Sequence, residues 1–271
     1  MILGIDFGAS TTDAVLLQGK RIVKKACAER VLVSPKELDS FLKKNKFHKF
    51  QIEGVAISGG KSAGFHKKIL GIKPKHVNEI DAIAFGAKFL TGSKRFLAVS
   101  MGTGTCIVLF QKKAGHVIGT GLGGGTVLGL SRLLLNESSP KKLAKLAEGG
   151  NLRNVDLSVK DVAGGKIGLL NADATASNFG KQGRHSRADL AAAVQSMAAE
   201  AVAVLAIAAS RQCNCRKVIF LGRTLSFPLV RKRLKKAAEL FKAEFSFPKD
   251  AEFGTAAGAA YYAQFKKQGR C

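Results

Sequence analysis

Two short turns rich in glycine, serine and threonine carry residue types that suit the binding of a polyphosphate. The first turn reads Asp6-Phe7-Gly8-Ala9-Ser10-Thr11-Thr12, and the second reads Gly102-Thr103-Gly104-Thr105. Turns of this composition leave backbone N–H groups exposed, and their hydroxyls can reach phosphate oxygens. The Asp6 carboxylate, at the end of an apolar segment, can hold Mg²⁺ directly or through water. One such turn is most often an ordinary hairpin, but a pair of them favours a phosphate site.

A third glycine-rich segment, residues 119–125, precedes an expected helix at residues 126–135. Its amides and the helix dipole would meet an anion at the helix N-terminus. The chain has no Gly-x4-Gly-Lys-Ser/Thr pattern, and its first turn lacks the strand-loop-helix setting of a Rossmann fingerprint. We therefore expect neither a P-loop nor a dinucleotide site.

The elements that must position these turns follow from the hydrophobic pattern. Short apolar runs bounded by turns predict strands at residues 2–5, 13–17, 54–58, 96–100, 106–110 and 217–221. Apolar residues at three- and four-residue spacing predict helices at residues 35–45, 79–90, 126–135, 189–211 and 255–265. A hairpin with a polar tip opens each of two α/β halves, which we expect at residues 1–92 and 93–271.

The chain is strongly basic, with 44 Lys and Arg residues against 19 Asp and Glu residues and a formal net charge of +25. Such a charge attracts phosphorylated ligands and nucleic acids. The basic residues nevertheless fall in short clusters interleaved with apolar residues, as is typical of solvated helix faces. Because the sequence has no Trp, two Tyr and no recognisable nucleic-acid module, we expect no nucleic-acid partner.

The cysteines favour neither a disulfide framework nor a zinc site. None of them forms a Cys-x2-Cys pair, so reduced thiols are expected at Cys27, Cys106, Cys213, Cys215 and Cys271. The Ala-rich segment at residues 191–209 includes Gln195 and Glu200, so we expect a buried helix and no membrane span. The first residues lack the basic region of a signal peptide, which predicts a cytoplasmic protein.

Two longer segments make the glycine-rich turns more specific. Residues 99–107 read Val-Ser-Met-Gly-Thr-Gly-Thr-Cys-Ile, and residues 117–130 read Val-Ile-Gly-Thr-Gly-Leu-Gly-Gly-Gly-Thr-Val-Leu-Gly-Leu. Both resemble the most distinctive stretch of the type II pantothenate kinases. Further segments agree and fall in the family's order, at residues 57–61, 77–82, 173–180 and 218–222. The resemblance spans nearly the whole chain.

The resemblance implies an α/β, two-domain actin-like (ribonuclease H-like) ATPase fold with mixed sheets, which closes around ATP between its domains. Residues 1–92 would form one ribonuclease H-like subdomain, and residues 93–271 would form the other, with a dimerisation helix. The implied reaction is ATP- and Mg²⁺-dependent phosphorylation of pantothenate to 4'-phosphopantothenate, the first step of coenzyme A biosynthesis. A homodimer is implied, and coenzyme A or its acyl derivatives regulate some members of the family.

The resemblance also assigns roles by position. Glu79 matches the catalytic glutamate, which would accept the proton of the substrate hydroxyl. On residue type alone, Glu79 would be an ordinary first-turn helix acid. Cys106 and His116 match substrate contacts, and Asp6 is the expected metal ligand. The expected nucleotide contacts are Asp6, Gly8, Ala9, Ser10, Thr11, Thr12, Asp13, Gly102, Thr103, Gly104, Thr105, Gly121, Leu122, Gly123, Gly124, Gly125, Gly222 and Arg223.

Three positions depart from the family's pattern, which usually has Lys at Asp13, Ser at Cys106 and Arg at His116. Asp13 leaves open how the polyphosphate charge is neutralised. A thiol donates poorly, and an imidazole cannot form the two parallel hydrogen bonds of a guanidinium to a carboxylate.

These departures keep two alternatives open. One is an actin-like-fold kinase or ATPase that acts on another small alcohol, a sugar or a partner protein. The other is a non-catalytic nucleotide-binding regulator whose basic surface engages nucleic acid.

Overall fold

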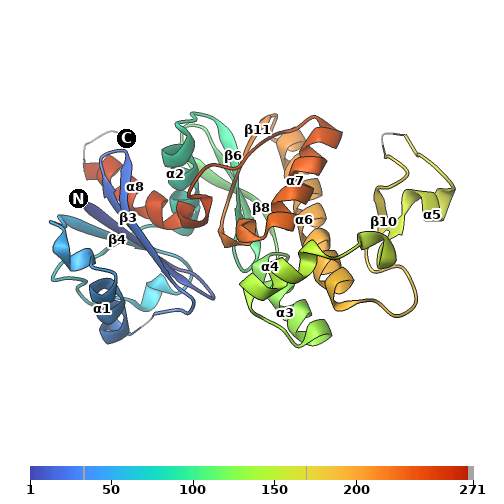
Figure 1. The fold of residues 1–271 in the computed structure, drawn as a ribbon. Helices are drawn as coiled ribbons and strands as arrows, with labels where there is room; N and C mark the ends of the chain where they lie inside the picture. The colour runs from blue at the N-terminus through green and yellow to red at the C-terminus, as the bar shows by residue number, and fades with distance from the viewer. Residues whose placement is uncertain (33, 169, 268–271) are drawn as a thin grey trace.

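The computed structural model describes residues 1–32, 34–168 and 170–267, which form two five-stranded mixed sheets with helices between and around them (Figure 1). The first sheet has the order β3-β2-β1-β4-β5, and the second has the order β12-β11-β6-β7-β8. The strands of the first sheet are β1 (Ile2–Phe7), β2 (Thr12–Gln18), β3 (Arg21–Ala28), β4 (Gly54–Ser58) and β5 (Lys75–His76). Those of the second are β6 (Phe96–Met101), β7 (Thr105–Phe110), β8 (Ala114–Thr120), β11 (Lys217–Leu221) and β12 (Glu244–Ser246).

The two sheets repeat one topology. In each, three consecutive strands form an antiparallel meander, β1-β2-β3 in the first sheet and β6-β7-β8 in the second. The opening strand of each meander then pairs in parallel with a later strand, β4 or β11. The predicted α/β class with mixed sheets is confirmed, and the repeat places both Gly/Thr turns at the same point of their sheets.

Helices form layers between and outside the sheets. Helix α8 (Gly254–Lys267) packs on β1, β2 and β4, and α2 (Glu79–Thr91) packs both on α8 and on the second sheet. Helix α6 (Arg187–Gln212) contacts β7, β8 and β11. The outer side of the first sheet is covered by α1 (Pro35–Lys44) through buried Leu38 and Leu42.

Strand alternation assigns each β1 side chain to one of these layers. Leu3, Ile5 and Phe7 belong to the core that includes α1, whereas Ile2 packs with α8. Because successive side chains point to opposite faces of a sheet, Asp6 shares the face of Ile2. The first turn therefore presents its carboxylate towards the layer that contains α2 and α8.

Helix α8 packs back on the first sheet, so that β1 and α8 lie on the same side of the molecule although they stand far apart in the sequence (Figure 1). A Cβ atom at Gly258 would collide with the Ala82 carbonyl oxygen of α2, so the absence of a side chain allows this close approach. The expected boundary near Gly92 stays a prediction, but α8 packs with the first half although it follows residue 93.

The remaining helices cover the second sheet or project from it. They are α3 (Gly124–Leu135), α4 (Pro140–Glu148) and α7 (Pro228–Phe241), with α5 (Val159–Ala163) and the strand pair β9 (Leu157–Ser158) and β10 (Thr175–Ser177) in a projecting arm (Figure 1). Short 3-10 helices lie at Phe47–Lys49, Ser62–Gly64, Leu152–Asn154, Arg223–Ser226 and Ala251–Phe253. The sequence pattern missed the strands β3, β5, β8, β9, β10 and β12 and the helices α4, α5 and α7.

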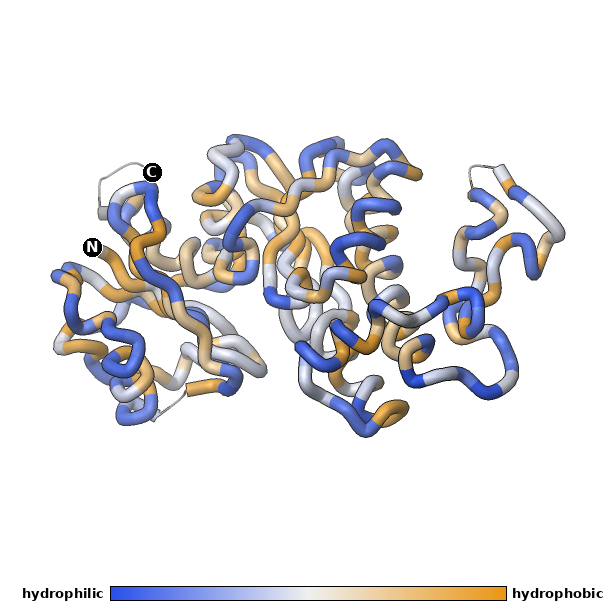
Figure 2. The backbone as a smooth tube through the Cα atoms, viewed as in Figure 1, coloured by the Kyte–Doolittle hydropathy of each residue, from blue (hydrophilic) through white to orange (hydrophobic). Residues whose placement is uncertain are grey.

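Apolar residues are concentrated in the strands and in the helix faces that meet them, and polar residues follow the outer faces (Figure 2). Among the described residues, α6 is the one helix long and apolar enough to cross a membrane, but 67% of its apolar window is buried inside the protein. That burial matches a core helix, as expected for residues 191–209.

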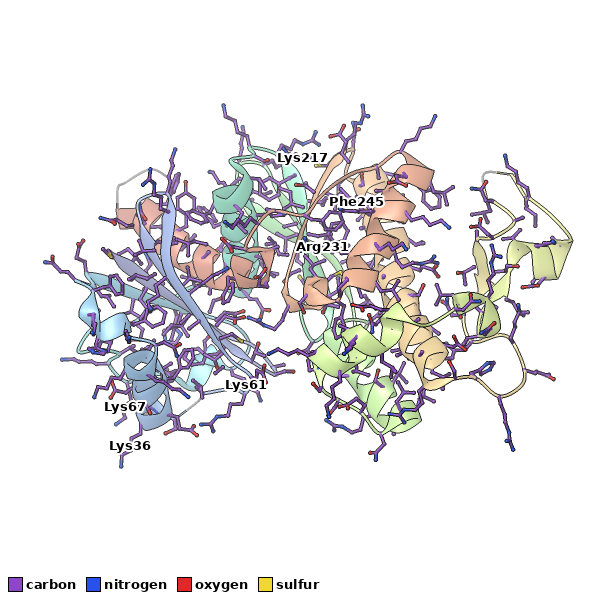
Figure 3. All side chains as sticks on the ribbon, in the orientation of Figure 1. Lys36, Lys61, Lys67, Lys217, Arg231 and Phe245 are labelled. Carbon is purple, nitrogen blue, oxygen red and sulfur yellow. The ribbon has the colours of Figure 1, made fainter. Side chains whose placement is uncertain are left out.

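Basic side chains stand mostly on the surface. Lys36, Lys67 and Lys217 are exposed and extend away from the ribbon (Figure 3). The free thiols among the described residues are those of Cys27, Cys106, Cys213 and Cys215, and Cys271 lies outside the described residues.

Candidate nucleotide and substrate site

The two Gly/Thr turns meet at the junction of the two halves. The turn between β1 and β2 touches the turn between β6 and β7 through the hydroxyls of Ser10 and Thr103, whose oxygens lie 3.0 Å apart. Both side chains are exposed, although 93 residues separate them in the sequence. The two turns that the sequence paired as a phosphate site therefore lie side by side.

Carbonyl groups of the second turn are anchored from below. The Gly102 carbonyl accepts hydrogen bonds from the Gly124 amide at 2.8 Å and from the Thr224 hydroxyl at 3.0 Å. The Thr103 carbonyl accepts one from the Gly125 amide at 2.9 Å. These hydrogen bonds tie the carbonyl side of the turn to the start of α3 and to Thr224, and they hold the turn in one orientation.

The third glycine cluster consequently has a different task from the one predicted. The amides of Gly124 and Gly125 donate to the second turn, so they do not form the anion site that the helix N-terminus suggested. A Cβ atom at Gly123 would lie 2.6 Å from the Thr103 carbonyl oxygen and 2.7 Å from that of Gly104. The cluster shapes the second turn by letting α3 approach it, whereas exposed Gly121 still borders open space.

The amides at the two turn tips remain to be satisfied. Within the described part of the chain, no protein acceptor is found for the N–H groups of residues 8–11 or residues 102–104. Unpaired amides beside exposed hydroxyls form a surface that suits phosphate oxygens. This is the property that the composition of the turns predicted.

Two predicted contact residues lie beneath the turns rather than on them. Thr12 is fully buried, and its hydroxyl accepts a 2.8 Å hydrogen bond from the Leu32 amide. Strand alternation turns Thr12 to the α1 side, away from Asp13. Thr105 is also buried and donates its hydroxyl to the Leu122 carbonyl at 2.7 Å. Both side chains support the turns from within, and direct contact of either residue with a nucleotide stays a prediction.

A pair of carboxylates lies at the base of the first turn. Asp6 and Asp13 are direct partners across β1 and β2. Burial, followed by repulsion from Asp13 and Glu79, raises the pKa of half-buried Asp6 to about 7. Burial also raises the pKa of Asp13, while Arg223 and a hydrogen bond from Cys27 act in the opposite direction. The site concentrates negative charge where few waters solvate it.

Arg223 compensates part of this charge from the other half of the molecule. Its guanidinium forms an ion pair with Asp13 across 210 residues of sequence and lies 5.2 Å from the centre of the Phe253 ring. Arg223 begins the 3-10 helix that follows β11, and Gly222 precedes it. The sequence named Arg223 but gave no sign of this pairing.

Glu79 is the first residue of α2. The Asn78 side chain caps the helix by accepting a 2.8 Å hydrogen bond from the Ile80 amide, which fixes where Glu79 emerges. Glu79 is exposed, and its charge raises the pKa of both Asp6 and Cys106. Its carboxylate therefore lies within electrostatic range of the expected metal ligand and of the expected substrate side.

Cys106 and His116 lie together on neighbouring strands. Cys106 pairs with Gly119 across β7 and β8, and the His116 Nε2 atom lies 3.8 Å from the Cβ position of that glycine. Burial, with a smaller effect of Glu79, raises the pKa of the Cys106 thiol to about 11. The structure thus places Cys106 and His116 side by side, and the charge of Glu79 acts on Cys106.

The carboxylates also bear on metal binding. Among the described residues, no group of three or more His, Cys, Asp or Glu side chains could enclose a metal ion. Mg²⁺, however, commonly uses one or two carboxylates together with phosphate oxygens and water. Asp6 fits this requirement, because burial and then the charges of Asp13 and Glu79 raise its pKa, and a divalent cation would offset that negative charge.

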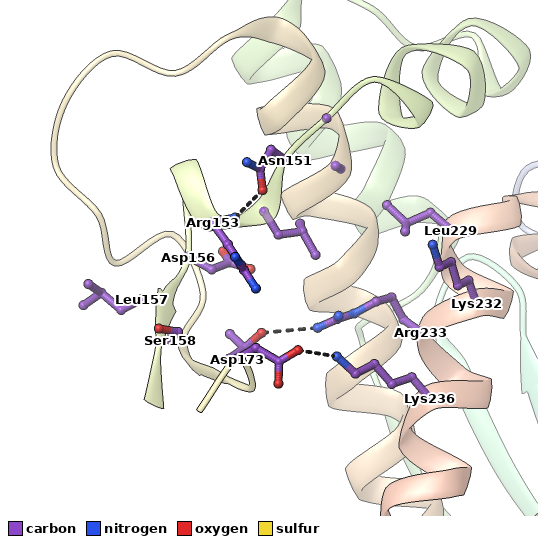
Figure 4. Close-up of a pocket in the computed structure, with 14 residues that line it drawn as sticks. Asn151, Arg153, Asp156, Leu157, Ser158, Asp173, Leu229, Lys232, Arg233 and Lys236 are labelled. Atoms are coloured by element: carbon purple, nitrogen blue, oxygen red, sulfur yellow. Dashed lines mark hydrogen bonds and ion pairs between the residues drawn. The ribbon is translucent and has the colours of Figure 1, made fainter. Parts of the chain in front are cut away.

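A cavity of about 390 Å³ lies away from the turns, between the projecting arm, α6 and α7 (Figure 4). There Lys236 bonds Asp173 at 3.1 Å, and Arg233 contacts Thr175 at 3.3 Å and pairs with Glu200. Residues 173–180, which the family resemblance singled out, therefore anchor the arm to α7. In this structure they form no part of the phosphate-binding surface.

This architecture is that of the actin-like ATPases and sugar kinases. A dehydratase activator from Clostridium difficile with bound ADPNP aligns with a TM-score of 0.66 over 99% of this chain and 97% of its own, at 13% identity. A ROK family glucokinase from Streptomyces griseus, in complex with glucose and AMPPNP, aligns with a TM-score of 0.65 at 13% identity. The alignment covers 97% of this chain and 99% of the glucokinase. The predicted two-domain actin-like fold is confirmed.

Within this fold class the sequence identifies a family. The model of the Fumble family matches residues 95–244, which is more than half of the chain, so the chain belongs to this family, that of the type II pantothenate kinases. A protein named type II pantothenate kinase from Bacillus thuringiensis subsp. konkukian is 29% identical over 235 residues, 82% of this chain and 83% of its own. A second protein of that name, from Oceanobacillus iheyensis, is 28% identical over 234 residues, which cover 83% of this chain and 84% of its own.

Proposed function

We propose that this protein transfers the γ-phosphoryl group of ATP to the hydroxyl of pantothenate, giving 4'-phosphopantothenate, in the first step of coenzyme A biosynthesis. The observation that carries the proposal is the meeting of the two Gly/Thr turns at Ser10 and Thr103, with the Glu79 carboxylate in electrostatic range. We choose pantothenate as the acceptor because the relatives are named type II pantothenate kinase. A kinase needs all three parts: a phosphate cradle, a carboxylate base and an alcohol.

In this proposal, the amides and hydroxyls of both turns hold the phosphate oxygens in line with the acceptor. Asp6 would hold Mg²⁺, and the ion would neutralise charge on the transferring phosphoryl group. Glu79 accepts the proton of the attacking hydroxyl as its oxygen bonds to the γ-phosphorus, while the bond from that phosphorus to the β–γ bridging oxygen breaks and ADP leaves. Its exposed position at the start of α2 lets it reach an acceptor that approaches from the Cys106 side.

The acceptor site includes Cys106 and His116. Neither side chain carries the guanidinium that would clamp a carboxylate through two parallel hydrogen bonds. Exposed His116 can still donate one hydrogen bond to the pantothenate carboxylate, with a lower share of binding energy. This difference favours a second candidate acceptor, another small alcohol or a sugar, for which no carboxylate clamp is required.

The direct test is phosphopantothenate formation by the purified protein with MgATP. Glu79→Gln keeps the shape of the side chain and removes the base, so we expect turnover to fall by about 10²–10⁴-fold. Arg216→Ala, which removes one member of an exposed 3.4 Å ion pair with Glu244, is the matched control and should retain activity.

A panel of alcohols and sugars under the same conditions separates the two acceptors. Phosphorylation of another alcohol with none of pantothenate would replace the proposed acceptor and leave the kinase in place. Absence of transfer to every acceptor by the folded wild type would contradict the kinase itself.

We also propose that the enzyme works in the cytoplasm as a homodimer. Exposed apolar side chains on the arm and on α6, at Val162, Ile167 and Val204, support a further contact between copies. Light scattering after gel filtration measures the mass directly, and a monomer at micromolar concentration would contradict the dimer.

A further inference from the structure

Arg223 is connected to the supports of both turns. The next residue, Thr224, is buried and donates its hydroxyl to the Gly102 carbonyl of the second turn at 3.0 Å. The Arg223 side chain itself pairs with Asp13, at the base of the first turn. The start of the 3-10 helix after β11 is therefore fixed on one turn, while its first side chain reaches the other.

The guanidinium is held on one side and accessible on another. One terminal nitrogen pairs with Asp13 Oδ1, and the Phe253 ring lies 5.2 Å from the guanidinium carbon. The Arg223 Nε atom is buried, and among the described residues it has no hydrogen-bond partner. The side chain keeps 33% of its surface exposed. A guanidinium has five N–H donors in a rigid fork, so donors remain for an incoming anion.

The surrounding charges make this cation important. Asp6, Asp13 and Glu79 form a negative cluster beside the turns, and a polyphosphate adds further negative charge. Arg223 lowers the pKa of both Asp6 and Asp13, in opposition to their burial. The family usually has a lysine where this chain has Asp13, so β2 lacks a positive charge that Arg223 brings from the second half.

We propose that Arg223 donates to the polyphosphate of the nucleotide and replaces the missing lysine, while Asp13 is a positioning residue that aims its guanidinium. Asp13 then does not touch the nucleotide, because a carboxylate and a phosphate oxygen repel each other. The exchange keeps one cation near the turns but moves its origin from β2 to the residue after β11. This proposal deepens the proposed kinase function, and it rests on ATP as the nucleotide.

Two other roles for Arg223 make different predictions. If Arg223 contacted the adenosine part of the nucleotide, its removal would weaken the binding of AMP and adenosine as much as the binding of ATP. If the Asp13–Arg223 pair only tied the two halves together, its removal would lower the melting temperature without a preference among nucleotides. A polyphosphate role instead weakens binding more strongly as phosphates are added.

Dissociation constants for MgATP, MgADP, AMP and adenosine, measured by calorimetry, distinguish these roles. For Arg223→Ala we expect MgATP affinity to fall by about 10- to 100-fold, as for loss of a charge-assisted hydrogen bond, with adenosine within about 2-fold of wild type. Arg223→Lys keeps the charge and should recover part of the loss. Arg216→Ala is the control for removal of an exposed arginine from the same half.

The decisive variant moves the cation back to β2. Asp13→Lys combined with Arg223→Ala should bind MgATP more tightly than Arg223→Ala alone, because the ammonium restores charge beside the first turn. Asp13→Asn should weaken MgATP less than Arg223→Ala does, since the guanidinium remains but is no longer aimed. Melting temperatures of all variants show whether each is folded.

An equal loss for all four ligands, or unchanged MgATP binding by folded Arg223→Ala, would overturn the proposal. These binding measurements do not involve the acceptor. If pantothenate is not phosphorylated but MgATP binding depends on Arg223, the proposed acceptor falls and the role of Arg223 stands. If pantothenate is phosphorylated equally by wild type and Arg223→Ala, the proposed acceptor stands and the role of Arg223 falls.

Discussion

The two sheets share one strand topology, yet their first hairpins carry different chemistry. In the first half the residue pair below the turn is Asp6 and Asp13, whereas in the second half the matching pair is Ser100 and Cys106. The second turn is anchored through its carbonyls by the start of α3 and by Thr224. One hairpin thus supplies charge and the other supplies a fixed shape, which shows how a repeated fold can divide the work of a single site.

The strongest test of this division substitutes, one at a time, the residues at matching positions of the two hairpins. Asp6→Asn removes the expected metal ligand, and because a metal ion contributes several kcal/mol to stabilising transition-state charge, we expect phosphoryl transfer to fall by on the order of 100-fold or more. Ser100→Ala, at the corresponding position of the second hairpin, should stay near wild type. Steady-state rates with MgATP measure both, and equal losses would show that the halves do not differ in this way.

The fixed shape of the second turn can be tested by adding one methyl group. Gly123→Ala places a Cβ against the carbonyls of Thr103 and Gly104, so we expect a loss of about 1–3 kcal/mol in the free energy of unfolding and weaker nucleotide binding. Gly102→Ala is the matched variant, because its nearest obstacle, the Gly104 carbonyl oxygen, is 4.0 Å away. Thermal unfolding compares them, and equal melting temperatures would contradict the anchoring.

The charge of the first hairpin should make ligand binding depend on pH. Asp6 has a pKa of about 7, raised by burial and by its acidic neighbours, so below pH 7 a proton must leave before the carboxylate can hold Mg²⁺. MgATP affinity should therefore fall as the pH drops below 7 and level off above it. Calorimetry in buffers of different ionisation enthalpy measures the released proton.

The nucleotide titrates in the same range, so Asp6→Asn serves as the reference for that experiment. The proton released at pH 6 should decrease in this variant. An identical release by wild type and Asp6→Asn would mean that the carboxyl group does not titrate near neutrality.

The smallest expected effect concerns the thiols on the two hairpins. Burial is the main cause that raises the pKa of Cys27 to about 12 and that of Cys106 to about 11, so both should alkylate slowly at pH 8. Glu79 adds to the shift of Cys106, and Glu79→Gln should speed alkylation of Cys106 several-fold relative to Cys27. Mass spectrometry of iodoacetamide adducts measures this, and an unchanged ratio would place Glu79 farther from the second hairpin.

Local patterns in the sequence predicted much of this arrangement. The expected helix at residues 79–90 is α2 at Glu79–Thr91, and the expected strand at residues 217–221 is β11. The missed β8 (Ala114–Thr120) is an edge strand with half-exposed and exposed residues, and four of them are glycine or polar, so the strand shows no apolar alternation. The missed α7 is basic on its solvent side, and its lysines and arginines concealed the apolar spacing of Val230 and Leu234.

The site itself was predictable only in part. Gly/Thr composition located both turns, because turn chemistry is local. The buried positions of Thr12 and Thr105 follow from strand alternation and from the approach of α3, which depend on the register of the completed sheets. The Asp13–Arg223 pair joins residues 210 positions apart, and a contact at that separation leaves no periodic trace in one sequence.

The return of α8 to the first sheet has a consequence for how the protein is made. Residues that cover Ile2, Val15 and Leu17, among them Ala256, Ala257 and Ala260, leave the ribosome after every strand of both sheets. Until they arrive, the inner face of the first sheet is open to water, so completion of that sheet follows translation of α8. Removal of α8 would leave a well-formed second sheet attached to a first sheet that exposes aggregation-prone apolar strands.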